Sequence, residues 1–244
     1  MENYKNQQEK NNKMTLNHIA FIMDGNRRWA RERGLHPWEG HNEGVKALER
    51  IGEHIKKKGI KYMTVYALSV ENILKRSKAE VLFHFKLHKK LFRQLIDTDR
   101  FMKDGIRFNV IGRVNMLPKD EQELIKQAME KTRNNDKHVF TACIAYNGQD
   151  EIVDACREII KEGVPAERIG RETIKQHLYT RNIPPPDLIV RTGMDPDMRL
   201  SGFLLWDSSY AEFAFTKTYW PALTEKEVDN IIKQFNARDR RKGK

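Results

Sequence analysis

The sequence lacks any long apolar run. Hydrophobic residues make up 39% of its 244 positions, and no stretch approaches the roughly 18 consecutive apolar residues of a membrane-spanning helix. The first fifteen residues are rich in Asn, Lys, Gln and Glu, so they do not predict a signal peptide. Cysteine is scarce: the chain has two, Cys143 and Cys156, and both are expected to be small buried side chains. These absences predict a cytoplasmic protein in a reducing compartment.

The sequence also lacks the signatures of nucleic-acid binding. It shows no zinc-finger spacing and no RNA-binding aromatic motif, and its basic residues are scattered. The net charge is nevertheless +11, and part of it lies in residues 237–244, where five basic residues accompany one acidic residue. The remaining charge favours an acidic membrane surface or a small polyanionic substrate over nucleic acid.

Apolar segments of strand length alternate with amphipathic helical segments along the chain. Such alternation predicts parallel pairing through right-handed crossovers, and hence an α/β fold with an open, mostly parallel six-stranded sheet covered by helices on both faces. We expect a disordered polar leader at 1–15, one domain at 16–236 and a basic tail at 237–244. The strand segments are 19–23, 61–68, 106–112, 138–146 and 187–191, with short candidates at 203–206 and 213–215.

The longest predicted helix begins at Ser77, where Ser-x-x-Glu is a capping box, and extends to about residue 103. It is apolar over more than one face, which is typical of a core helix. His84 and His88 lie one turn apart on it. Because no third ligand is apparent, they are not predicted to bind a metal ion.

Residues 18–30 carry the most informative pattern. A short apolar strand is followed by Asp24, Gly25 and Asn26, which supply a carboxylate, a flexible turn and a helix cap, and then by Arg27 and Arg28. Unpaired N–H groups at the start of a helix and two arginines suit a phosphate. A carboxylate beside a phosphate points to Mg²⁺. The alternative is an ordinary turn in which Asp24 only caps the helix.

Polar residues also follow the second and fifth strands, namely Ser69 with Asn72 and Arg191 with Thr192. Since ligands collect beyond the carboxyl ends of parallel strands, all three groups should face one crevice. Two basic groups in one crevice fit two diphosphate substrates. The first comprises Gly25, Asn26, Arg27 and Arg28 with His41, and the second comprises Arg191, Arg199 and Ser201.

Several motifs together resemble the cis-prenyltransferases, whose bacterial members are the undecaprenyl diphosphate synthases. The resemblance covers nearly all of residues 18–235. The motifs are MDGNRRWA at 23–30, EGH at 39–41 with Gly44, SVEN at 69–72, PDLIVRT at 186–192, RLSGFLLW at 199–206 and YAE at 210–212.

The resemblance implies a Mg²⁺-dependent enzyme that joins isopentenyl diphosphate to an allylic diphosphate and forms a cis double bond. It implies that Asp24 holds the metal ion, with Glu212 contributing to the metal or to the neighbouring subunit's site. It also implies that Asn26, His41 and Asn72 act with Asp24 in catalysis, and that the long apolar helix lines a hydrophobic tunnel. It also implies a homodimer with peripheral membrane contact. Substrate-binding positions carried over from the motifs are Gly25, Arg27, Arg28, Trp29, Ser69, Arg191, Arg199 and Ser201.

The chain also departs from the family pattern. Pro37 stands where an arginine usually precedes the EGH motif, Ile73 replaces a tryptophan, and AYNGQ at 145–149 replaces Asn-Tyr-Gly-Gly-Arg. The interval from Arg191 to Arg199 is two residues longer and includes Asp195 and Asp197. These changes indicate a divergent member. They leave open an enzyme that makes short, branched or cyclic products, or a catalytically silent prenyl-binding partner subunit.

Overall fold

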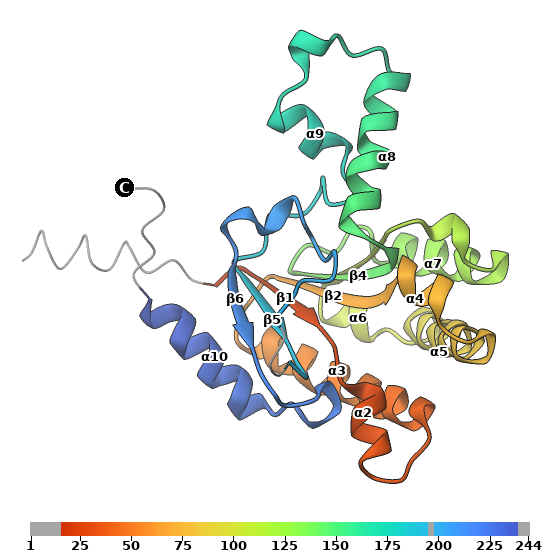
Figure 1. The fold of residues 1–244 in the computed structure, drawn as a ribbon, viewed down its shortest axis with the longest axis vertical. Coiled ribbons are helices and arrows are strands. Elements are labelled where there is room, and N and C mark those ends of the chain that lie inside the picture. Colours follow the sequence, from red (N-terminus) through yellow and green to blue (C-terminus); the bar gives the residue numbers. More distant parts are fainter. Residues whose placement is uncertain (1–15, 195–197, 239–244) are drawn as a thin grey trace, which may run out of the picture.

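The computed structural model describes residues 16–194 and 198–238. Six parallel strands form one open sheet in the order β3-β4-β2-β1-β5-β6 (Figure 1). This confirms the predicted sheet. The predicted leader, Asp195, Asp197 and residues 239–244 of the basic tail lie outside the described residues. The strands are β1 (His18–Ile22), β2 (Tyr62–Ser69), β3 (Ile106–Ile111), β4 (His138–Tyr146), β5 (Leu188–Arg191) and β6 (Glu212–Phe215).

Helices connect the strands and close the chain. Several begin at a side-chain cap; the Thr224 side chain, for example, accepts a hydrogen bond from the Glu227 N–H. The α-helices are α2 (Asn26–Arg31), α3 (Pro37–Lys57), α4 (Val70–Lys75), α5 (Lys78–Asp97), α6 (Arg100–Lys103), α7 (Lys119–Thr132), α8 (Gly148–Lys161), α9 (Arg171–His177) and α10 (Glu225–Ala237). Short 3-10 turns occupy Val114–Met116, Ala166–Arg168, Asp207–Tyr210 and Trp220–Ala222.

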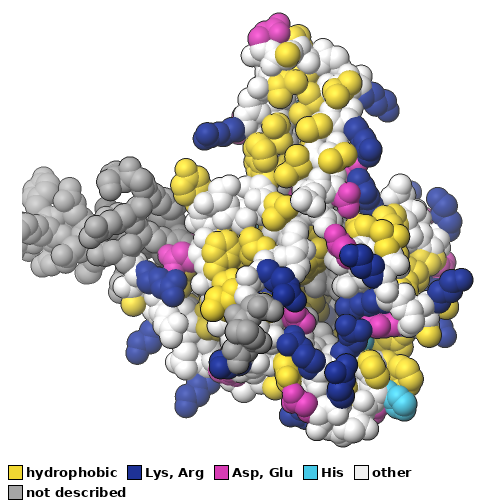
Figure 2. Space-filling view, viewed as in Figure 1, with side chains coloured by type: hydrophobic (Ala, Val, Ile, Leu, Met, Phe, Trp, Pro, Cys, Tyr) yellow, Lys and Arg dark blue, Asp and Glu magenta, His cyan; other side chains and the backbone are white. Residues whose placement is uncertain are grey.

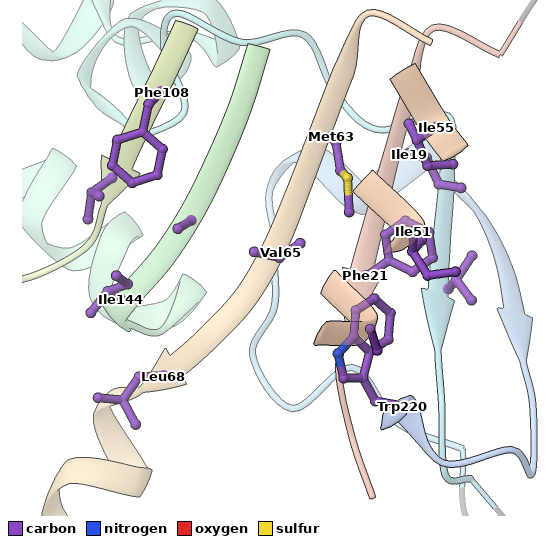
Figure 3. Packing of buried hydrophobic residues seen from close by; sticks show 14 of the residues in the cluster. Ile19, Phe21, Ile51, Ile55, Met63, Val65, Leu68, Phe108, Ile144 and Trp220 are labelled. Atoms are coloured by element: carbon purple, nitrogen blue, oxygen red, sulfur yellow. The ribbon is translucent and has the colours of Figure 1, made fainter. Parts of the chain in front are cut away.

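The core lies mainly on one face of the sheet. Side chains alternate along a strand, so Ile19 and Phe21 of β1 point to this face, where α3, α5, α7 and α10 pack. Phe21 contacts the Trp220 ring with centroids 5.6 Å apart, next to Ile51 of α3 (Figure 3). Each fully buried side chain of this kind contributes about 1.5–3 kcal/mol.

The opposite face has a smaller core. It includes Ala20 and Ile22 of β1 with Phe203 and Leu204 of the chain after β5. The segment 203–206 was predicted to be a strand, and this is wrong. Leu204 has a φ of 46°, which is incompatible with extended backbone, and the segment is a series of turns that packs onto the sheet instead.

Two other predictions need correction. The long helix expected to reach about residue 103 ends at Asp97, because Thr98 is extended (φ −109°, ψ 156°), and α6 follows separately. The Lys131 ammonium donates to the carbonyl oxygens of Ile96 and Thr98, so a contact from α7 stabilises this break. Cys143 is buried as expected, but Cys156 is exposed on α8.

Helices α8 and α9 project beyond the sheet, and Figure 2 shows apolar side chains gathered over this projection. Val153, Ile160 and Ile169 are 44%, 75% and 40% exposed. Within the described ranges, no helix combines the length and apolar character needed to cross a bilayer.

Candidate active site

The carboxyl ends of β1, β2 and β5 open into one cavity of about 910 Å³. The three polar groups predicted to converge do meet here. Among the predicted site residues, those that line the cavity are Asp24, Asn26, Arg27, Arg28, His41, Ser69, Asn72, Arg191, Arg199 and Ser201.

The turn after β1 depends on Gly25. Its φ is 99°, and a Cβ at this position would lie 2.4 Å from the Tyr219 ring, so only glycine fits. Trp220, which follows Tyr219, donates its backbone N–H to the Asp24 carbonyl oxygen at 3.0 Å and its indole N–H to the Gly44 carbonyl oxygen at 2.8 Å. Residues near the end of the chain therefore fix the shape of this turn.

Asp24 does not serve as an ordinary helix cap. Its Oδ1 accepts from the Gly25 N–H at 2.6 Å and lies 3.2 Å from Arg28 Nη2, while its Oδ2 accepts from Arg191 Nη2 at 2.8 Å. Burial by itself would raise the pKa of Asp24, but Arg191 and Arg28 outweigh it and hold this pKa below its usual value. The carboxylate is thus kept ionised at the mouth of the cavity.

Asn26 is the first residue of α2 and not its cap, contrary to expectation. Its side-chain amide donates to the Met23 carbonyl oxygen at 3.0 Å. A Cβ on Gly40 would lie 2.1 Å from the Asn26 carbonyl oxygen, and one on Gly44 would lie 2.4 Å from Asn26 Oδ1. These two glycines let α3 approach α2 closely, which brings His41 to the cavity.

The second basic group is built around Arg191. Its side chain is 5% exposed, and its Nη1 donates to the Arg199 carbonyl oxygen at 2.5 Å and to Ser201 Oγ at 2.8 Å. Ser201 has a φ of 51°, so its backbone is held in an unusual conformation at this contact. The arginine joins the loop after β5 to the Asp24 turn.

Ser69 and Asn72 lie at the end of β2. Ser69 Oγ accepts from the Asn72 N–H at 3.0 Å and caps α4, and both residues face the cavity. At the end of β4, Asn147 caps α8 by accepting from the Gln149 N–H at 2.7 Å. These residues of the divergent AYNGQ segment also line the cavity.

Sequence reasoning missed three side chains beside His41. Glu80 Oε1 lies 3.6 Å from His41 Nε2 and 2.9 Å from Arg76 Nη1, and Arg76 Nη1 also donates to His84 Nε2 at 2.8 Å. Burial, with a smaller effect of Arg76, lowers the pKa of His41 to about 4, so its imidazole is neutral near pH 7. Only one of the two bonds of the predicted capping box forms: the Glu80 N–H donates to Ser77 Oγ at 3.3 Å. The Glu80 carboxylate instead faces His41 and Arg76.

A smaller extension of about 320 Å³ adjoins the Asp24 turn. It is lined by Arg27, Arg28, Arg31 and Arg76, so four guanidinium groups surround the Asp24 turn. Pro37, by contrast, is the first residue of α3, with His36 as its cap.

Two predicted site residues lie elsewhere. The Trp29 ring does not line the cavity and is covered by the Arg33 guanidinium at 4.4 Å. Glu212 pairs in register with Leu188, which pairs with Ile19. It therefore sits at the amino end of the sheet, five residues before the level of Asp24, or roughly 16 Å along the strand direction. There it accepts from Arg238 at 3.1 Å, so the two carboxylates cannot share an ion within one chain.

A second, mostly apolar cavity of about 220 Å³ lies behind the first. It is bounded by α3, α5 and strands β2 to β4. The two cavities have five wall residues in common, which are Val45, Leu48, Ala67, His88 and Leu91. The two cavities are therefore adjacent, with these five residues between them.

Comparison with known proteins gives a consistent result. The model of the undecaprenyl diphosphate synthase family matches residues 22–243. A tritrans,polycis-undecaprenyl-diphosphate synthase (geranylgeranyl-diphosphate specific) from Pyrococcus abyssi is 42% identical over 231 residues, covering 93% of this chain and 86% of the relative. An isoprenyl transferase from Fusobacterium nucleatum is 43% identical over 226 residues, covering 93% and 95%.

Solved structures agree with the sequence relatives. The lavandulyl diphosphate synthase from Lavandula x intermedia, in complex with dimethylallyl diphosphate, superposes with a TM-score of 0.87 at 33% identity, covering 94% of this chain and 99% of that one. A probable undecaprenyl diphosphate synthase from Campylobacter jejuni gives a TM-score of 0.78 at 32% identity, with the same coverage.

Proposed function

This chain belongs to the undecaprenyl diphosphate synthase family of prenyltransferases, and we propose that its two basic groups bind two different diphosphates. It is an isoprenyl transferase that condenses isopentenyl diphosphate with an allylic prenyl diphosphate, forms a cis double bond and releases diphosphate. The observation that supports the proposal most directly is the meeting of Asp24, Arg28 and Arg191 at the mouth of one cavity.

The allylic diphosphate binds at the Asp24 turn. The Gly25–Asn26 backbone, Arg27 and Arg28 face this space, and Arg31 and Arg76 supply positive charge that the family's arginine at the Pro37 position would otherwise give. As the diphosphate leaves carbon its negative charge grows, and these fixed donors stabilise the transition state. His41, neutral at this wall, is placed to accept a proton as the new double bond forms.

Isopentenyl diphosphate binds at the second group, formed by Arg191, Arg199 and Ser201. Arg191 is rigidly held by its bonds to Ser201 and Asp24, and guanidinium groups suit bidentate contacts with phosphate. Because Arg191 also bonds Asp24, the two diphosphates lie on either side of one ion pair. Ser69 and Asn72 line the same cavity beside the two diphosphate sites.

Mg²⁺ is the cofactor that fits this donor set. Asp24 offers an ionised carboxylate beside a space lined with phosphate-binding groups, and Mg²⁺ takes one or two protein carboxylates with phosphate oxygens as further ligands. When bound, the ion neutralises charge on the departing diphosphate. Glu212 does not reach a metal ion held by Asp24 of the same chain, so any metal binding by Glu212 would be at the site of a neighbouring subunit.

The apolar cavity behind the crevice is proposed as the start of a hydrophobic tunnel for the growing chain. Ala67 lies on the wall between the two spaces, and its small side chain leaves the passage open. Each added isoprenoid unit removes five carbons from water, so a long apolar space favours polyprenyl products.

A homodimer is proposed on the exposed apolar side chains of α8 and of the segment between α8 and α9, which suit a second copy of this chain. The protein would act in the cytoplasm and meet the membrane only at its surface, where its net positive charge favours anionic lipids.

The test is incorporation of radiolabelled isopentenyl diphosphate, with geranylgeranyl, farnesyl or dimethylallyl diphosphate as primer, followed by chromatography of the products. Products that grow by five carbons, and that vanish with EDTA and return with Mg²⁺, are expected. An irregular product without extension would favour a branching or cyclising enzyme. No incorporation with any primer would mean a silent binding subunit.

A further inference from the structure

A second set of metal-ligating side chains lies near the small extension of the cavity that adjoins the Asp24 turn, which His41 also lines. It comprises His41 from α3 with Glu80 and His84 from α5, and their ligand atoms all lie within 4.8 Å of one another. The His41 and His84 rings meet edge to face with centroids 4.3 Å apart. His88, one turn further along α5, takes no part, because its Nδ1 bonds Glu121 at 3.0 Å.

Two of these ligand atoms are buried without a hydrogen bond. They are His41 Nε2 and Glu80 Oε1, and the His41 side chain is only 9% exposed. A buried polar atom without a hydrogen bond costs about 1–3 kcal/mol, and at Glu80 Oε1 the ion pair with Arg76 offsets part of this cost. The two atoms lie 3.6 Å apart.

Arg76 already brings positive charge to this space. Its Nη1 lies 2.8 Å from His84 Nε2 and 2.9 Å from Glu80 Oε1, the latter as an ion pair without hydrogen-bond geometry. The guanidinium therefore marks the place where a cation is stabilised. Arg76 also borders the 910 Å³ cavity, which gives its side chain room to move aside.

We propose that His41, Glu80 and His84 form a binding site for a divalent transition-metal ion of the Zn²⁺ class, which displaces Arg76. Two imidazoles and one carboxylate are the usual protein ligands of such ions, with a fourth position left for water or a phosphate oxygen. Mg²⁺ prefers oxygen ligands alone, so this site is chemically distinct from the carboxylate of Asp24.

The protonation states suit this role. Burial lowers the pKa of His41 to about 4 and that of His84 to about 2, so both imidazoles are neutral at pH 7 and no proton must leave before a metal ion binds. An ion held by His41 prevents that residue from accepting a proton. Given the proposed function, binding of a zinc-class ion to His41 should therefore inhibit prenyl transfer.

The test is titration of metal-free, untagged full-length protein with Co²⁺, followed by its visible d–d absorption. We expect one equivalent to bind with the intense spectrum of a four-coordinate ion. This spectrum should be lost in His84→Leu and retained in Asp24→Asn. It should also be retained in His36→Ala, the matched control, because His36 is an exposed histidine at the cap of α3.

Arg76→Met provides a second, independent measurement. Removing the competing guanidinium should lower the dissociation constant for Co²⁺ severalfold, a gain that loss of folding cannot imitate. The proposal is overturned if neither the native protein nor Arg76→Met gives the spectrum, if His84→Leu retains it while folded, or if Arg76→Met leaves the dissociation constant unchanged. Because the readout is binding without substrate, it is independent of whether the prenyltransferase proposal holds.

Discussion

The carboxylate of Asp24 and the guanidinium of Arg191 form an ion pair at 2.8 Å that joins the ends of β1 and β5. The sequence motifs place these residues in different roles, one with the metal ion and one with isopentenyl diphosphate. In the fold each is a partner of the other. A change at either residue should therefore affect both substrates, whereas residues further out should affect one.

Asp24→Ala should lower kcat/KM by two to three orders of magnitude, about 3–4 kcal/mol of transition-state stabilisation, because the leaving diphosphate loses its metal ligand. It also leaves Arg191, only 5% exposed, without this partner. Asp24→Asn, which keeps the shape, is the control for stability. Steady-state kinetics and thermal unfolding of both variants measure the effect, and near-normal turnover by folded Asp24→Ala would contradict the assignment.

Arg199→Gln should raise the KM for isopentenyl diphosphate on the order of tenfold, since a charged hydrogen bond contributes about 1.5–3 kcal/mol. The KM for the allylic primer should change less. Arg191→Gln should raise both constants, because it also releases Asp24. The two substrates are varied separately for each variant. Equal rises of both constants in Arg199→Gln would show that the basic groups do not divide the substrates.

Ala67→Leu should shorten the products while the first condensation continues. The larger side chain fills space between the two cavities. Each methylene of the product that is thereby kept out of the apolar cavity loses about 0.8 kcal/mol of burial free energy. Ala67→Ser, which keeps the residue small, is the matched control. Product chromatography measures the chain lengths. If the native enzyme already stops at short chains and the variant gives the same distribution, another part of the protein limits product length.

Acid should destabilise the fold through His18. Its Nδ1 donates to the Pro184 carbonyl oxygen and its Nε2 accepts from Thr64, both at 2.8 Å, and burial lowers its pKa to about 4. The unfolded chain binds the proton near pH 6.5, so stability is full above that pH and is lost as the pH falls toward 4, by roughly 3 kcal/mol. Burial of His41 and His84 acts in the same direction.

Urea unfolding of His18→Gln at pH 7.5, 6 and 5 measures this effect. The variant should be less stable at pH 7.5 but should lose less stability on acidification. Its unfolding should take up about one proton fewer than that of the native protein, so its free energy of unfolding should depend less steeply on pH. If its pH dependence matched that of the native protein, His18 would not be the titrating group.

Much of the architecture could be predicted because it depends on local pattern. Apolar runs such as 19–22 are buried on both faces of the sheet, and the rule for parallel strands brought Asp24, Ser69 and Arg191 to one crevice. The same rule argues against Glu212 as a partner of Asp24, since Glu212 begins its strand and so lies at the opposite end of the sheet. The prediction of Glu212 as a metal ligand relied on the motif resemblance, although the sheet topology argues against it.

The cluster around His41 could not be predicted in this way. Glu80 fits a capping-box pattern, and His84 was paired with His88 because they are close in sequence. Their actual partners depend on how α3 packs against α5, which is set by the close approach at Gly40 and Gly44. Tertiary contacts of this kind leave no periodic signal in the sequence. The turns at 201–204 were missed for a similar reason, since apolar residues there pack onto the sheet without being extended.

The covering of the Asp24–Gly25 turn by Tyr219 and Trp220 has a consequence for biosynthesis. The Asp24–Gly25 turn is made long before Tyr219 and Trp220, whose contacts shape it. Contacts so distant in sequence form slowly, because a long loop must close before they are gained. A growing chain on the ribosome therefore carries its arginines and carboxylate without a shaped crevice, and acquires affinity for diphosphate only when Tyr219 and Trp220 have left the ribosome and have docked.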